Sequence, residues 1–273
     1  MSDQERSLET LFASTDIADL RLALDRVRGE IARQGSQAAR SLFEPLAAMF
    51  YIDTLDHPEL LPLVEEAISL VTGFGDWVIP RLVENLDEGD VKAQMASAEA
   101  LGRLGADAID PLVDKYLAAR DAPTRSFVLY ALGKIRSPLI VRASDLALAG
   151  ARSDDLELRD TATRSIGRFV EVIPRDQMPE TVRKGFHDAL HRNLADPNKG
   201  IKAKAVRSLG KMARVGHLAP AELAELQAIT HNLLGTDEDF RWDRAYVVRK
   251  EAAETLRHCE QLEAPEQQSE GRA

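Results

Sequence analysis

The sequence predicts an all-α protein, built as a right-handed α-solenoid of about five to six stacked helix pairs. The 273 residues include 38 Ala and 35 Leu, which are strong helix formers, whereas aromatic residues make up only 5%. Val, Ile and Thr do not alternate with polar residues as they would in a sandwich or barrel. Four segments of the chain also share one pattern, and tandem repetition is the signature of a solenoid.

The repeated pattern combines three features in a constant register. Each copy closes with an apolar residue, a glycine, a basic residue and an apolar residue, and the glycines are Gly102, Gly133, Gly167 and Gly210. Eight residues before these glycines stand Gln94, Arg125, Arg159 and Lys202. Four residues earlier again stand Asp90, Asp121, Asp155 and Asn198.

The N-terminal part of the chain is expected to cap the array. Residues 1–35 form this helical cap, with an amphipathic helix at 16–33. Further helices at 41–50 and 58–71 open the repeat array, which is expected to span residues 36–260. Their patterns differ from the later copies because a terminal repeat has only one neighbour to cover.

Each later copy is expected to form a helix pair, with a first helix (A) and a second helix (B). In the first pair, a helix ending at 86 is followed by a turn at 87–90 and a B helix at 91–104. The next pair has helices at 109–119 and 125–135, with Pro123 in the first turn of its B helix. The third and fourth units cover residues 141–172 and 181–215.

The last copy departs from the pattern. Its helices are expected at 221–234 and 248–256, and a longer insert at 235–246 separates them. Residues 261–273 contain no large apolar side chain after Leu262, which is typical of a disordered tail.

Two roles are expected for the polar positions of the pattern. The residues Asp90, Asp121, Asp155 and Asn198 precede the B helices, where their side chains can cap the helix N-termini. The basic residues that start the B helices are expected to pair with turn aspartates of their own or the next repeat, forming a structural ladder that satisfies the turns. Its basic members are Arg125, Arg159, Lys202 and Arg249.

These features resemble HEAT repeats, including the short bacterial type first noted in phycobilisome bilin lyases. The resemblance rests on the turn aspartate, the basic residue of the B helix and the closing Ala/Ser-Leu-Gly, and it covers residues 77–258 closely and 36–76 loosely. It implies a right-handed solenoid with the B helices on its inner face and specifies little about function. The sequence departs from the family pattern at Gln94, Asn198 and Arg257, which is expected to weaken the ladder locally.

Charge and composition exclude several classes of protein. The formal net charge of −10 disfavours a general nucleic-acid binder, because neutralising phosphates requires a basic surface. The single cysteine, Cys259, excludes an internal disulfide framework and a CxxC metal site. No apolar run approaches about 18 residues and no secretory signal opens the chain, so we expect a cytoplasmic protein without a membrane span.

No catalytic, metal or cofactor site is predicted. His187 and His191 have the spacing of zinc ligands, but Asp188 stands where a zinc protease needs glutamate and no third ligand is apparent. The Gly73-Phe-Gly75 segment lacks the third glycine and the strand of a dinucleotide site.

Enzymes built from similar repeats are also disfavoured. The di-iron site of deoxyhypusine hydroxylase uses His-Glu dipeptides, and this chain has none. HEAT-like DNA glycosylases use an aromatic-lined groove, for which only Trp77 and Trp242 are available here.

Two sets of residues are candidates for binding a partner. The first is the basic series that follows the closing glycines, which either complements the helix dipoles or forms a basic rim. This series comprises Arg103, Lys134, Arg168 and Lys211. The second is the aromatic set of the insert, Phe240, Trp242 and Tyr246, which either binds a partner or folds back to cap the last repeat.

The sequence therefore predicts a non-catalytic scaffold or adaptor that binds a protein partner of unknown identity along its concave B-helix face. Two alternatives stay open. One is an accessory or lyase-type chaperone subunit for a cofactor-containing enzyme, and the other is nucleic-acid binding through a local basic groove.

Overall fold

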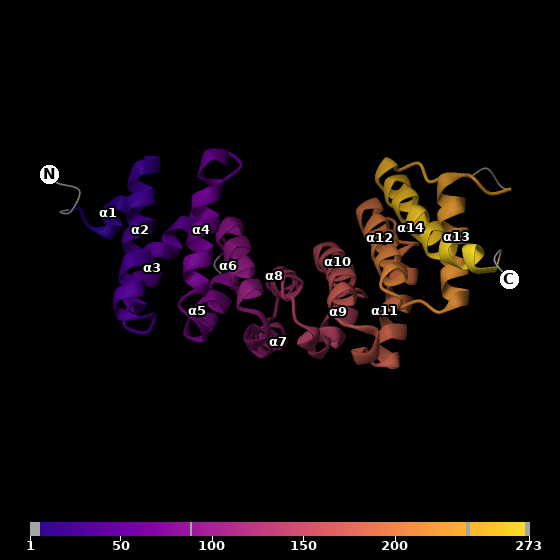
Figure 1. Cartoon of the computed structure of the whole chain (residues 1–273), viewed down its shortest axis with the longest axis horizontal. Coiled ribbons are helices and arrows are strands. Elements are labelled where there is room, and N and C mark those ends of the chain that lie inside the picture. The colour runs from indigo at the N-terminus through magenta and orange to yellow at the C-terminus, as the bar shows by residue number, and fades with distance from the viewer. Residues whose placement is uncertain (1–5, 88, 239–240, 271–273) are drawn as a thin grey trace. The chain divides into compact units, whose positions relative to one another are not determined.

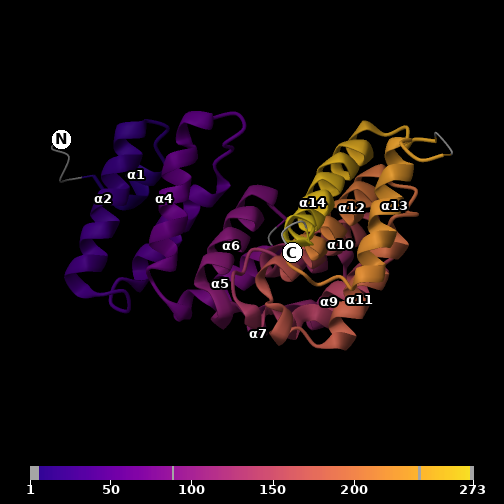
Figure 2. The ribbon, with the colours of Figure 1, turned by 45° about the vertical axis from the view of Figure 1, so that its right-hand side comes forward.

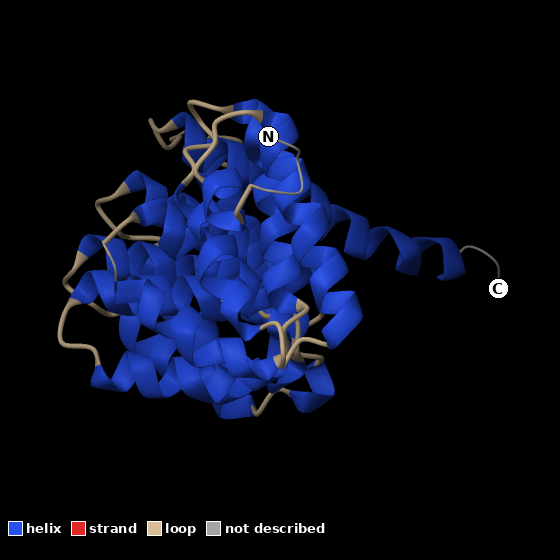
Figure 3. Ribbon diagram, turned by 90° about the vertical axis from the view of Figure 1, so that its left-hand side faces the viewer, coloured by secondary structure: helices blue, strands red, loops and turns tan. Residues whose placement is uncertain are grey.

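The computed structural model describes residues 6–87, 89–238 and 241–270. These residues form α-helices and short 3-10 helices joined by turns, with no strand (Figure 3). None of the described helices is long and apolar enough to cross a membrane. Each helix packs against helices close to it in the chain, so the predicted all-α solenoid is confirmed.

The chain divides into two compact units, Met1–Ala118 and Ala119–Ala273. The sequence predicted other boundaries, with a cap at 1–35 followed by one array at 36–260. The difference follows from repeat architecture, in which each helix pair packs only on its neighbours and no single core joins the whole chain.

In the first unit, α2, α4 and α6 pack in succession, and α3 and α5 pack against this row (Figure 1). Trp77 lies among Phe43 and Phe74, with ring centroids 5.9 and 5.4 Å apart, so its indole belongs to the packing of this unit. The α-helices of this unit are α1 (Leu8–Phe12), α2 (Ile17–Gln34), α3 (Phe43–Ala47), α4 (Leu61–Thr72), α5 (Ile79–Glu84), α6 (Val91–Leu104) and α7 (Ile109–Ala118).

In the second unit, the B helices α8, α10, α12 and α14 pack one against the next. Figure 2 shows α10, α12 and α14 of this row. We call these four helices the B-helix layer. The A helices α9, α11 and α13 pack against α10, α12 and α14. The bounds are α8 (Ala122–Leu132), α9 (Ser144–Gly150), α10 (Leu156–Val172), α11 (Glu180–Asn193), α12 (Lys199–Arg214), α13 (Pro220–Leu234) and α14 (Tyr246–Glu270).

The B helices begin directly after their capping residues. Asp90 accepts hydrogen bonds from the N–H groups of Lys92 and Ala93 at 2.9 and 3.0 Å, and α6 spans the predicted residues 91–104. Helix α8 begins at Ala122, three residues before the predicted start, because Asp121 accepts the N–H of Thr124 at 2.8 Å. The side chains of Asp155 and Asn198 cap α10 and α12 in the same way.

Neighbouring B helices of the second unit approach most closely at the closing glycines. A Cβ atom added at Gly167 would lie 2.9 Å from the Cβ of Ser208, and one added at Gly210 would lie 2.5 Å from Oγ1 of Thr255. At Gly133 the added atom would lie 3.2 Å from Oγ of Ser165. Each closing glycine therefore admits a small hydroxyl side chain of the next B helix, as only glycine can.

The same hydroxyl groups donate hydrogen bonds across the B-helix layer. Ser165 donates to the carbonyl of Leu129 at 2.9 Å, and Ser208 donates to that of Thr163 at 3.2 Å. Thr255 donates to the carbonyl of Val206 at 3.4 Å. Each acceptor lies four residues before a closing glycine, so the contact recurs with the repeat. We call it the glycine–hydroxyl contact.

The C-terminal helix extends further than the sequence predicted. Helix α14 runs to Glu270, past residue 260 where the array was expected to end and a disordered tail at 261–273 to begin. Residues 271–273 of that tail lie outside the described part.

Replacing Gly167 by alanine tests the close approach of the helices. The Gly167→Ala substitution should lower the free energy of unfolding by about 1–3 kcal/mol, because the new methyl group overlaps Ser208. Urea unfolding of the purified chain measures this change.

The matched control is Gly29→Ala in α2, where nothing lies within 4 Å of an added Cβ atom. This change should raise the free energy of unfolding by up to about 1 kcal/mol through helix propensity. A Gly167→Ala variant as stable as Gly29→Ala would contradict the close packing.

Candidate functional site

The basic residues at the start of the B helices bind the turns that precede them. Arg125, Arg159 and Arg249 each donate to the backbone carbonyl six residues earlier, at 2.8, 2.6 and 2.7 Å. Gln94 occupies the same position in α6, and its amide donates to the carbonyl of Leu86 at 2.8 Å. The glutamine therefore keeps a hydrogen bond to its turn without carrying a charge.

Two of the basic residues that start the B helices, Arg159 and Lys202, reach the turn of the next repeat. Arg159 lies 2.7 Å from the carboxylate of Asp196, and Lys202 lies 2.6 Å from that of Asp243. Asp196 and Asp243 are buried, and each stands six residues before the basic residue of its own repeat. The predicted ladder did not include these two aspartates, although their spacing of six residues from Lys202 and Arg249 is the signal that identifies them.

Within the described part of the chain, the capping aspartates form no ion pair. The carboxylate groups of Asp90, Asp121 and Asp155 accept hydrogen bonds from the first turn of their own helices.

Burial acts to raise the pKa of Asp243, but the hydrogen bonds from Lys202 and from the N–H of Ala245 outweigh it and hold the pKa below its ordinary value. Asp243 is therefore a charged link between α12 and the turn before α14.

The basic residues after the closing glycines do not form one uniform rim. In the first unit, Arg103 pairs with Glu65 and donates to Oγ of Ser69 at 2.9 Å. In the second unit, the ammonium group of Lys211 lies 2.8 Å from the carboxylate of Glu171.

The other two members of this series are placed differently. The Lys134 ammonium group lies 5.1 Å from the ring centroid of Tyr130. Arg168 reaches only the carbonyl of Gly133, at 3.5 Å, and has no carboxylate partner among the described residues. Arg168 therefore has no ion pair of the kind that Arg103 and Lys211 form.

The aromatic side chains of the insert do not adopt the capping arrangement, which was one of the two that the sequence allowed. Trp242 is 62% exposed and Tyr246 is 72% exposed, so the indole of Trp242 is not folded back into the last repeat. The Arg249 guanidinium lies over the Trp242 ring, 4.5 Å from its centroid. Asp243 anchors this part of the insert instead, and Phe240 lies outside the described residues.

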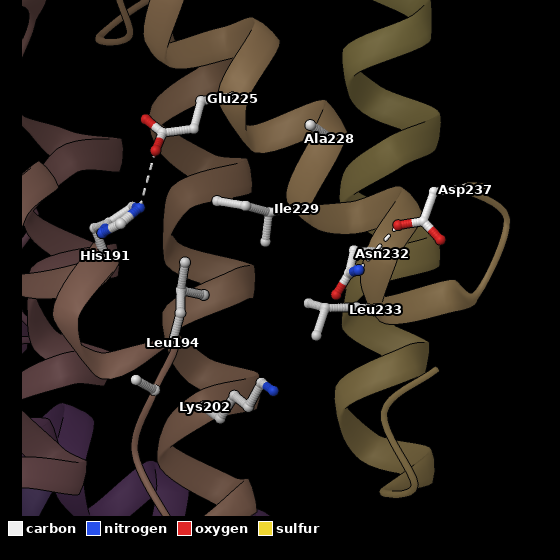
Figure 4. A pocket seen from close by; sticks show the side chains of 10 residues that line it. His191, Leu194, Lys202, Glu225, Ala228, Ile229, Asn232, Leu233 and Asp237 are labelled. Carbon is white, nitrogen blue, oxygen red and sulfur yellow. Dashed lines mark hydrogen bonds and ion pairs between the residues drawn. The ribbon is translucent and has the colours of Figure 1, made fainter. Parts of the chain in front are cut away.

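An open groove of about 520 Å³ lies along α11, α13 and the start of the insert (Figure 4). Its floor is apolar and includes Leu194 and Ile229. At its rim, Nε2 of His191 lies 3.1 Å from the carboxylate of Glu225. His187 stacks on His191 at a centroid distance of 6.0 Å, and within the described residues no three potential metal ligands converge.

Comparisons with known proteins agree with this architecture. Residues 93–115 match the family of PBS lyase HEAT-like repeats. No curated protein matches the sequence.

Several solved structures are similar in fold. Kap95p, described with RanGDP, has a TM-score of 0.56 at 15% identity, covering 92% of this chain and 35% of that one. The CpcE–CpcF complex of phycocyanin lyase from Nostoc sp. PCC7120 has a TM-score of 0.51 at 19% identity, covering 65% and 97%. A computationally designed armadillo repeat protein for modular peptide recognition has a TM-score of 0.50 at 13% identity, covering 94% and 99%.

The ladder makes a prediction about stability. Replacing Asp196 by alanine should lower the free energy of unfolding by about 2–3 kcal/mol, because it leaves the Arg159 guanidinium half-buried without its carboxylate. Asp188→Ala removes an exposed carboxylate from α11 and should change the free energy by less than about 0.5 kcal/mol. Urea unfolding compares the two, and equal losses would show that the Arg159–Asp196 pair contributes nothing specific.

Proposed function

We propose that this chain, an all-α solenoid in which residues 93–115 match PBS lyase HEAT-like repeats, is a non-catalytic, cytoplasmic scaffold. It binds a protein partner through the B-helix layer of residues 119–273. Solenoids suit this role because they present a broad surface formed by successive repeats.

The observation that carries the proposal is the cluster at the start of α14, in which the exposed Trp242 and Tyr246 lie beside the half-buried Arg249. Trp242 stacks on the Arg249 guanidinium, and Tyr246 lies one turn before Arg249 on the same helix. Tryptophan, tyrosine and arginine dominate the energetics of protein interfaces. Large exposed aromatic side chains are otherwise unfavourable on the surface of a protein in water.

The anchoring of this cluster supports the same role. Asp243 holds the turn between Trp242 and Tyr246 through Lys202 and through the N–H of Ala245 at 2.9 Å. Arg249 donates to the carbonyls of Asp243 and Arg244 at 2.7 and 3.0 Å. Because the backbone beneath the aromatic rings is already fixed, binding orders few groups and loses little conformational entropy.

A second candidate is an accessory subunit for a cofactor-containing enzyme. It is supported by the match of residues 93–115 to PBS lyase HEAT-like repeats. The likeness to the CpcE–CpcF complex points in the same direction. In that case the chain would be isolated with a coloured cofactor or with a partner that carries one.

The test is affinity purification of the tagged full chain from its source cells, followed by mass spectrometry and an absorption spectrum. The wild-type chain should recover one protein in near-stoichiometric amount without visible absorbance. The double variant Trp242→Ala/Tyr246→Ala should recover at least about tenfold less, since hot-spot truncation costs about 2 kcal/mol or more.

The matched control is Leu139→Ala/Leu156→Ala, which removes two other exposed apolar side chains from the same unit. The control should retain the partner, and both variants should keep the wild-type melting temperature. Equal recovery by the two variants would contradict the proposed site. A coloured eluate would replace the first candidate by the second.

A further inference from the structure

The segment around α8 has an unusual charge. Residues 122–144 contain no aspartate or glutamate, although the whole chain has a net charge of −10. The same segment contains four basic residues, Arg125, Lys134, Arg136 and Arg142. A B helix next to α8 therefore finds no carboxylate on it.

The opposite arrangement is found at α12, which lies between α10 and α14. All six of its basic side chains lie within 4.0 Å of a carboxylate from a neighbouring segment. The pairs are Lys199 and Lys202 with Asp243, Lys204 with Asp160, Arg207 with Glu251, and Lys211 and Arg214 with Glu171. Each cation of α12 therefore lies beside a carboxylate of the protein, with four carboxylates serving the six cations.

The arginines of α10 that lie beside α8 have no such carboxylate partner. The stem of Arg168 lies against Gly133, where an added Cβ atom would be 3.2 Å from its Cδ. Arg164 is exposed one turn earlier on α10, and Arg136 is exposed just beyond the end of α8. Among the described residues, none of these three has a carboxylate within ion-pair distance. We call them the arginine cluster.

The nearest acid to the cluster on α10 is already engaged. Glu171 lies 2.8 Å from Lys211 and also pairs with Arg214. Burial, followed by repulsion from Arg164 and Arg136, lowers the pKa of the Arg168 guanidinium from its ordinary value. Arginine nevertheless stays protonated, so the cluster holds like charges that a bound anion would stabilise.

We propose that the arginine cluster (Arg136, Arg164 and Arg168) binds a short acidic segment of a protein partner through two or three carboxylates. This inference rests on the proposed function, because it names a chemical property of the partner that the scaffold binds. Guanidinium groups bind carboxylates through paired hydrogen bonds, which gives both affinity and orientation.

The surroundings favour a short acidic segment over a nucleic acid. A nucleic acid carries a charge at every phosphate and needs a continuous basic track. The cluster is local, since the cations of the neighbouring α12 are all engaged in ion pairs. The net charge of −10 also repels a long polyanion, whereas two or three carboxylates match three guanidinium groups.

The test measures fluorescence anisotropy of a labelled peptide containing three successive glutamates, titrated with the full chain at low salt. The double variant Arg164→Gln/Arg168→Gln should bind this peptide at least about tenfold more weakly than wild type. The control Lys199→Gln/Arg207→Gln removes the same charge from paired residues of α12, whose partners Asp243 and Glu251 do not belong to α10, and should weaken binding less than about threefold. A peptide with three glutamines should not bind.

A third variant, Arg136→Gln, changes an exposed residue beyond α8 and keeps the test valid if the α10 double variant unfolds. It should weaken glutamate-peptide binding by at least about threefold. Equal weakening by Arg164→Gln/Arg168→Gln and by the α12 control would overturn the proposal, because it would show nonspecific attraction. Tighter binding of a short single-stranded DNA with the same dependence on the cluster would also overturn it, in favour of a nucleic acid.

Failure of this inference is distinguishable from failure of the proposed function. If the chain still recovers a protein through Trp242 and Tyr246 while the peptide shows no preference for the cluster, only the acidic-segment inference fails. If no protein is recovered, the scaffold proposal fails independently of the peptide result.

Discussion

The close packing of successive B helices in residues 119–273 depends on the glycine–hydroxyl contact. Gly167 leaves no room for a methyl group beside Ser208, and the serine hydroxyl donates to the backbone of the same neighbouring helix at 3.2 Å. Because hydrogen bonds to a backbone carbonyl have strict distance limits, this contact sets how closely the helices approach. The short separation then lets cations of α12 reach carboxylates on both sides, including Asp160 and Glu251.

The distribution of charge follows from this packing. Ion pairs between helices occupy α12 almost completely, and pairs such as Arg159–Asp196 and Lys202–Asp243 join consecutive turns. Pairs that are partly exposed contribute modestly to stability, but they place a carboxylate beside every cation of α12. We propose that a partner binds side chains that the internal packing leaves exposed. These are the arginine cluster near α8 and the aromatic rings at the start of α14.

Much of this fold is predictable from the repeat itself. The register of Asp90 and Gly102 predicts α6 at residues 91–104, because a cap and a closing glycine mark the ends of a helix in the sequence. The ladder was harder to predict. Asp243 pairs with a residue 41 positions away, and the aligned pattern did not include its position. The sequence also did not decide whether Trp242 is buried or exposed, since an aromatic side chain in an insert suits a core and an interface equally well.

The most direct test of the account is hydrogen–deuterium exchange of the full chain, alone and with the protein that it recovers from cells. Binding through the B-helix layer predicts slower exchange in the segments beside the two proposed contacts, residues 134–138 and 241–246. It predicts no change in α11 and α13, which line the groove of His191 and Glu225. Slower exchange along α11 and α13, with residues 134–138 and 241–246 unchanged, would contradict the account and place the partner in that groove.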